Sequence, residues 1–298
     1  MKFELTVHTA LDELRMQMLG TQVLFGFQFQ GVFQDGFKSL PHPVQLIDLT
    51  VLGILVLTLS FLVAPAAQHR LVERGVATKR LFNTANRFAG VALATYALAI
   101  GIDVFVVAST HWGDVPSAIA GCGAVMVAVL LWFGLGVIAK GSERREAMPN
   151  RKDPELHEKI DQMLTESRVI LPGAQALLGF QFVVTMTSAF HELPSPVQNT
   201  HLAALGAVLL AIVLLIAPAS VHRLAFGGQD AERMHGLGSN LITIALMPLA
   251  VGIAMDVYVA LATVIPGSTP LAGGVASFGL LAALWYVVPL LIRARQTK

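Results

Sequence analysis

The chain has 298 residues, of which 55% are hydrophobic and only 13% are charged, and its mean hydropathy is +0.67. A soluble globular domain usually carries about 25% charged residues, so this composition excludes an ordinary soluble domain. The net charge of +1 offers no basic surface for nucleic acid, and the single cysteine, Cys122, excludes a disulfide scaffold. These exclusions leave a polytopic membrane protein with the lipid bilayer as its first partner.

Long apolar segments follow one another along the whole chain. A helix that spans a bilayer needs about 20 mostly apolar residues. Eight windows meet this requirement, at 17–37, 45–66, 87–110, 116–139, 169–190, 200–220, 238–265 and 272–292. The first window is unusually polar because it contains five glutamines. The sequence therefore predicts an all-α protein with eight transmembrane helices.

The basic residues gather in alternate loops. They are Arg70, Arg74, Lys79, Arg80 and Arg87 after the second window, Lys140, Arg144, Arg145, Arg151 and Lys152 after the fourth, Arg223 and Arg233 after the sixth, and Arg293 and Arg295 after the eighth. Lys and Arg in short loops mark the cytoplasmic side of a membrane protein. We therefore expect a multi-pass membrane protein with both termini in the cytoplasm.

The sequence is duplicated at an offset of 153 residues. ELRMQMLGTQVLFGFQF from Glu13 matches ESRVILPGAQALLGFQF from Glu166, LPHPVQ matches LPSPVQ, and APAAQHRL matches APASVHRL. Between Glu13 and Leu71, 26 of 59 positions are identical without a gap. Four spans per repeat bring both halves into the membrane in the same direction, which predicts parallel repeats related by a pseudo-twofold axis along the membrane normal.

We divide the chain accordingly into a first repeat at 1–140, a charged cytoplasmic linker at 141–165 and a second repeat at 166–298. The second half of the linker has the apolar spacing of an amphipathic helix that runs into the fifth span.

The repeated unit, with its ELR, LFGFQF, LPxPVQ and APxxxHRL segments, resembles the small four-helix bacterial membrane proteins grouped as domain-of-unknown-function family 6328. The resemblance covers nearly the whole chain as two tandem copies. It implies that single-copy relatives form dimers, and a homodimer of this chain, a pseudo-tetramer of repeats, is compatible with it.

Both repeats retain an aspartate inside the membrane, Asp103 and Asp256. Asp103 precedes His111 by eight residues, so it lies about 12 Å from the outer end of its helix. A carboxylate at such depth costs at least about 2.5 kcal/mol and needs a partner. Small residues on the same face, Ala99 and Gly252, indicate that both aspartates point into the bundle. They form either a proton or cation site or a structural hydrogen bond between helices.

Gln28 and Gln181, at the same depth in their helices, are the candidate donors to these aspartates. We expect them to support an ion site, and the alternative is ordinary hydrogen bonding between helices.

A second set of charged residues repeats at the cytoplasmic ends of the first two helices of each half. We expect it to form a cluster that links those two helices within each repeat. Its members are Glu13, Arg15, His69, Arg70, Glu166, Arg168, His222 and Arg223.

Several kinds of chemistry find no motif here. CxxC, GxxxxGK[ST] and HExxH are absent, which argues against thiol-redox, nucleotide and zinc-protease functions. No span carries two histidines spaced for haem. We therefore expect no cofactor, no metal site and no catalytic residue.

The sequence favours transport or conduction of protons or small monovalent cations, with Asp103 and Asp256 as carriers. The alternative is a non-catalytic accessory, scaffold or lipid-binding protein of the inner membrane. An enzyme that acts on lipid ranks third, because no nucleophile and base recur in both repeats.

Overall fold

The computed structural model describes residues 2–71, 73, 76, 78–135, 154–227, 231–287 and 290–291. Every regular element in these residues is helical. The predicted linker lies outside them as far as residue 153, and from Pro154 onward it is helical. The expected amphipathic segment is therefore the first part of the long helix α7 (Pro154–Thr185), with Ile160, Met163 and Leu164 buried.

The two repeats contain the same succession of elements. The first consists of α1 (Lys2–Gly31), the short α2 (Asp35–Ser39), α3 (His42–Leu71), α4 (Lys79–Ser109) and α5 (Asp114–Val129), which continues into a π-helical turn, η1 (Leu130–Gly134). The second consists of α7, the short α8 (Ser188–His191), α9 (Ser195–Leu224), α10 (Glu232–Ala262) and α11 (Thr269–Ala282), which continues into the π-helical turn η2 (Ala283–Val287). The π turns interrupt the last helix at positions that the 153-residue offset relates.

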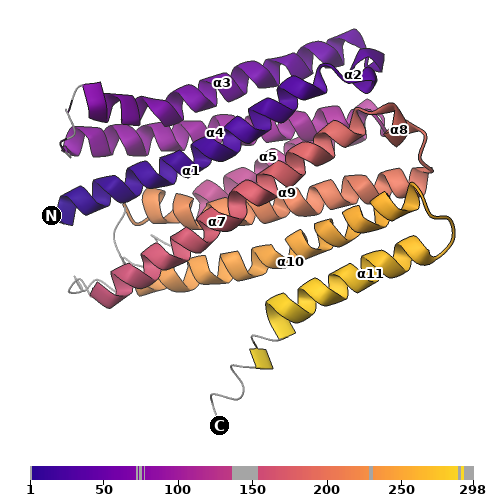
Figure 1. Ribbon diagram of the computed structural model, residues 1–298. Helices are drawn as coiled ribbons and strands as arrows, with labels where there is room; N and C mark the ends of the chain where they lie inside the picture. The colour runs from indigo at the N-terminus through magenta and orange to yellow at the C-terminus, as the bar shows by residue number, and fades with distance from the viewer. Residues whose placement is uncertain are drawn as a thin grey trace.

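Seven of these helical segments are long and apolar enough to cross a membrane: His42–His69, Lys79–Ser109, Asp114–Gly134, Leu156–Thr185, Ser195–Leu224, Glu232–Ala262 and Thr269–Val287. They correspond to the second to eighth windows of the sequence. The first helix, α1, is not among the seven, because glutamines and charged residues lower its hydropathy. It nevertheless lies against α7, its counterpart, and the two run in the same direction across the front of the bundle in Figure 1.

The repeated LPxPVQ segment folds the same way in both halves. Its glutamine turns back over the preceding short helix and donates to three backbone carbonyls. Gln45 Nε2 lies 3.1, 3.3 and 3.0 Å from the oxygens of Phe37, Lys38 and Leu40. Gln198 Nε2 lies 3.0, 3.3 and 3.0 Å from the equivalent three. This motif therefore caps a loop, and its repetition has a structural cause.

The repeats pack against each other along α1 and α7, where glycines permit close approach. The side chain of Gln175 fills the space in which a Cβ of Gly20 would stand, and the Phe27 ring fills that of Gly179. A twofold axis would place Gln22 against Gly173 in the same way. Among the described residues, however, no atom lies within 4 Å of the Cβ position of Gly173, and Gln22 is exposed. The pseudo-twofold axis therefore stays a prediction.

The equivalent helices α3 and α9 also differ in their surroundings. α9 packs against α4 and η1 of the first repeat, and 67% of its most apolar stretch is buried, compared with 28% for α3. Trp132 in η1 is fully buried and donates from Nε1 to the carbonyl of Val213 at 2.9 Å. α9 is consequently a central helix, whereas α3 lies at an edge of the bundle (Figure 1).

Candidate functional site

We call Gln28, Asp48 and Asp103 the outer cluster of the first repeat. These polar side chains come from three helices. Gln28 on α1 donates from Nε2 to Oδ1 of Asp48 on α3 at 2.8 Å and approaches its carbonyl at 3.3 Å. Asp103 on α4 interacts electrostatically with Asp48 and is only 4% exposed. Its Oδ1 is buried and has no hydrogen-bond partner within the described part of the chain. The amide of Gln28 therefore serves Asp48, and the neighbouring acid Asp103 receives no hydrogen bond from it.

The outer cluster of the second repeat has the same plan with one residue changed. Gln181 on α7 donates from Nε2 to Oδ2 of Asp256 on α10 at 2.8 Å. His201 on α9, which occupies the position equivalent to Asp48, places Nδ1 3.6 Å from Oδ1 of Asp256 and Nε2 3.1 Å from the carbonyl of Gln181. The imidazole is buried, whereas the Asp256 side chain is 22% exposed.

Close helix packing holds the second cluster together. One turn before Asp256, a Cβ on Gly252 would lie 2.6 Å from Cγ2 of Val208. α9 and α10 therefore approach each other closely next to the carboxylate. The small-residue face that the sequence indicated is where these two helices meet.

At the opposite end of the bundle, Glu13 on α1 meets the last turn of α9. Arg223 donates from Nε to Oε2 of Glu13 at 3.0 Å, from Nη2 to the same oxygen, and from Nη2 to the carbonyl of Ala10 at 2.9 Å. His222 Nδ1 lies 3.3 Å from Oε1. Burial raises the pKa of Glu13, but Arg223 and His222 outweigh burial and lower this pKa from 4.5 to about 2.

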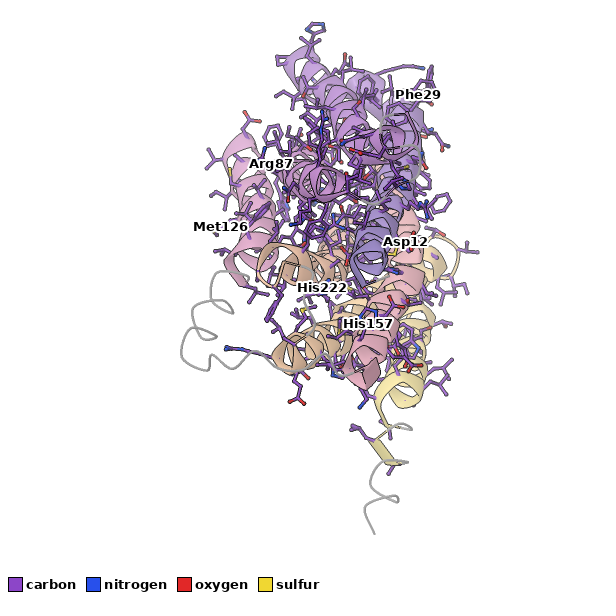
Figure 2. All side chains as sticks on the ribbon, turned by 90° about the vertical axis from the view of Figure 1, so that its left-hand side faces the viewer. Asp12, Phe29, Arg87, Met126, His157 and His222 are labelled. Carbon is purple, nitrogen blue, oxygen red and sulfur yellow. The ribbon has the colours of Figure 1, made fainter. Side chains whose placement is uncertain are left out.

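Figure 2 looks along the helices, and His222 lies near the middle of the bundle, with Met126 at one edge.

The sequence predicted that the repeated charged residues would link the first two helices of each repeat. That prediction is wrong for Glu13, because its partners Arg223 and His222 belong to the other repeat. Both partners belong to the last turn of α9, and their side chains reach Glu13 on α1.

The other predicted members of the charged set have different roles. Arg15 pairs with Asp12 at 2.6 Å on the surface, and Glu166 is exposed. Arg168 is half-buried, and its Nε and Nη2 have no hydrogen-bond partner in the described residues. His69 lies in the last turns of α3, and the side chain of Arg70 is outside the described part of the structure.

A column of polar side chains runs between the repeats, from the Glu13 cluster toward the first outer cluster. One cavity is bordered by Glu13, Gln17 and Arg168, and a second is bordered by Gln17, Tyr96 and Gln175. Gln175 Nε2 donates to the Tyr96 hydroxyl at 2.8 Å across the repeat interface. Tyr96 in turn interacts electrostatically with Asp103, two helical turns further along α4. Neither cavity is lined by an aspartate of the outer clusters.

The described residues hold no group of three or more His, Cys, Asp or Glu side chains that could bind a metal ion.

Comparison with known proteins places both halves in one family. The model of the family of unknown function DUF6328 matches residues 4–136 and again residues 150–289. The chain belongs to the DUF6328 family. No curated protein and no solved structure matches it. The two matches confirm that this chain is a tandem duplication of the DUF6328 unit.

The sequence predicted one of the hydrogen bonds in the two outer clusters, but it did not indicate Asp48 or His201. Gln181 donates to Asp256 as expected, but Gln28 donates to Asp48 instead of Asp103. Asp48 and His201 are equivalent positions with different residues, so they do not appear among the positions that are identical in both repeats. They belong to the positions that are polar in both repeats but differ in residue.

Proposed function

We propose that this DUF6328 protein carries protons or small monovalent cations across a membrane, along the interface between its two repeats. The observation that carries the proposal is the burial of the Asp103 carboxyl group without a full set of partners. This carboxyl group is 4% exposed, interacts electrostatically with the carboxyl group of Asp48, and has one oxygen without a partner in the described residues. A proton or a small cation bound between the two carboxyl groups would supply the missing contact.

The polar column between the repeats supports a path to this site. Oε1 of Gln17 and Oε1 of Gln175 are both buried without a hydrogen-bond partner in the described residues, and both glutamines border the cavities. Polar atoms around a small cavity are where ordered water binds in proteins. Water at these atoms would connect the Glu13 cluster to Tyr96, which interacts with Asp103. The path measures about 22 Å from Glu13 to Gln28 at helical rise.

The proposal includes finer features of the architecture. α1 serves as the eighth span, because its counterpart α7 has the length and hydropathy of a span and the two helices pack together. The basic residues in alternate loops support cytoplasmic termini, and the protein would lie in the inner membrane of a bacterium. The Glu13 cluster then faces the cytoplasm and the two outer clusters face the other side. The role is not catalytic.

A second candidate function is a non-catalytic scaffold, accessory or lipid-binding protein. The observation that favours it is that the two cavities stop short of both aspartates. In addition, Gln175 donates to Tyr96 across the interface between the repeats, and Arg223 donates to Glu13. Polar contacts of this kind specify which helices pair, without moving any ion.

Flux measurements in proteoliposomes separate the two candidates. Vesicles loaded with a pH-sensitive dye would be exposed to imposed proton, sodium and potassium gradients. We expect flux in the wild type and its loss in the double variant Asp103→Asn and Asp256→Asn. Asp35→Asn, at an exposed ion pair with Lys38, is the matched control and should retain flux.

The stability of each variant decides what a loss of flux means. A double variant that melts like the wild type but carries no ions supports transport. A wild type that carries nothing above empty vesicles, beside an active control transporter, supports the scaffold function.

A further inference from the structure

The two outer clusters differ at a single equivalent position, and that difference changes the charge of the cluster. Gln28 and Gln181 are equivalent, as are Asp103 and Asp256, but Asp48 of the first repeat is replaced by His201 in the second. The first cluster contains two acids and an amide. The second contains one acid, an amide and an imidazole.

Hydrogen-bond chemistry constrains the imidazole of His201. A carbonyl oxygen only accepts, so Nε2, 3.1 Å from the carbonyl of Gln181, carries a hydrogen. Nδ1 is then directed at the Asp256 carboxyl group, 3.6 Å away. Whichever of the two groups holds it, a proton between Nδ1 and Oδ1 removes the repulsion between a ring lone pair and a carboxylate.

The Asp256 carboxyl group of the second cluster is therefore satisfied by the protein itself, whereas Oε1 of Gln181 is buried without a hydrogen-bond partner in the described residues. Oδ2 of Asp256 accepts from Gln181 and Oδ1 faces His201, so each oxygen has a protein partner. Packing leaves little freedom for the ring, because His201 is 3% exposed.

The first cluster lacks an equivalent of that imidazole. Its acids, Asp48 at 5% and Asp103 at 4% exposure, are both buried, and Gln28 donates only to Asp48. Oδ1 of Asp103 has no partner in the described residues. On α4, Tyr96 lies two turns before Asp103 and interacts with it electrostatically, but a phenol offers no positive charge. An uncompensated buried acid is costly, so a positive charge from outside the chain is required.

We propose that the protein binds its ion at one site per chain, between Asp48 and Asp103 of the first repeat, and that His201 takes the place of that ion in the second repeat. The ligand is one positive charge held by oxygen atoms, either a proton or a small hard monovalent cation. This inference takes its ligand class from the proposed function, but the asymmetry of the two clusters stands on the contacts alone.

Carbodiimide labelling tests the number and place of the sites. Dicyclohexylcarbodiimide reacts with carboxyl groups in apolar surroundings when they are protonated, and peptide mass spectrometry locates the adduct. The wild-type protein in detergent should be labelled at Asp48 or Asp103 and not at Asp256. Sodium, lithium, potassium and N-methylglucamine chlorides at one pH and ionic strength identify the ligand. Slower labelling in a metal salt identifies that metal cation, and equal labelling in all four identifies the proton.

Reciprocal substitutions provide the decisive comparison. Asp48→His should abolish labelling of the first repeat, and His201→Asp should create a second labelled site at residue 201 or Asp256. The combined swap should move the single site to the second repeat. His201→Asn serves as a neutral control at the same position and should create no site. Melting temperature and a monodisperse elution profile check the folding of each variant.

Equal labelling of Asp103 and Asp256 in the folded wild type would overturn the inference, and so would a first-repeat site that survives Asp48→His. If a swapped variant fails to fold, the location of the adduct in the wild type still decides. The proposed function is tested by a different measurement, the ion flux in proteoliposomes. Absence of flux with one labelled site refutes transport alone, whereas flux with two equally labelled sites refutes the asymmetry alone.

Discussion

Arg223, in the last turn of α9, donates to the buried carboxylate of Glu13 on α1 and so joins the end of the second repeat to the start of the first. Both side chains are almost fully buried, at 4% and 3% exposure. A buried ion pair is weak evidence for net stabilisation, but the loss of one partner leaves an uncompensated charge. This pair therefore makes the contact between the repeats sensitive to single substitutions.

Replacement of Arg223 should destabilise the protein strongly. Arg223→Met leaves the Glu13 carboxylate buried without its main counter-charge, and we expect a loss of about 3–5 kcal/mol. Arg15→Met is the matched control, because Arg15 pairs with Asp12 at 64% and 47% exposure. An exposed pair contributes at most about 1 kcal/mol. Unfolding in detergent measures both, and equal losses would contradict the importance of the buried pair.

Acid should weaken the same contact. The folded-state pKa of Glu13 is about 2, below its ordinary value of 4.5, so its stabilisation is fully present above pH 4.5 and is lost as the pH falls toward 2. The difference corresponds to about 3 kcal/mol. Melting temperatures across this range should fall more steeply for the wild type than for Glu13→Gln. Parallel curves for the two proteins would show that the carboxylate makes no such contribution.

The glycines of α1 and α7 offer two matched comparisons between equivalent positions. Gly179→Ala should destabilise by about 1–3 kcal/mol, because its methyl group meets the Phe27 ring. At the equivalent Gly26, no atom of the described part of the chain lies within 4 Å of the Cβ position. Gly26→Ala should be neutral or stabilise the helix by up to about 1 kcal/mol. Gly20→Ala and Gly173→Ala should differ in the same way. Thermal unfolding of the four variants tests this, and equal effects within each pair would contradict the asymmetric contact.

The glutamine of the LPxPVQ motif should matter for stability in the same way in both repeats. Gln198→Ala removes the donor to three carbonyls, and we expect a cost of about 1–3 kcal/mol because those carbonyls lose their partner. Asn199→Ala, at the exposed next residue, is the control and should change little. If Gln198→Ala unfolds like the control, the loop does not depend on this cap.

Some features of this protein could be read from the sequence alone. The uninterrupted apolar segments give the spanning helices, and the 153-residue offset gives the duplication that the family matches confirm. These features are local or depend only on comparison of the chain with itself. The contact of Gln181 with Asp256 was also predictable, because depth along neighbouring helices follows from residue spacing.

Other features were decided only by the tertiary structure. Self-comparison shows which residues are alike, but it does not show which of two equivalent residues makes a contact. Glu13 had candidate partners in His69–Arg70 and His222–Arg223, and the central place of α9 brought the second pair to it. Asp48 and His201 became visible only when the helices placed each beside its neighbours. Glu13 contacts only one of the two equivalent His–Arg pairs, so helix packing gives the two similar repeats different contacts.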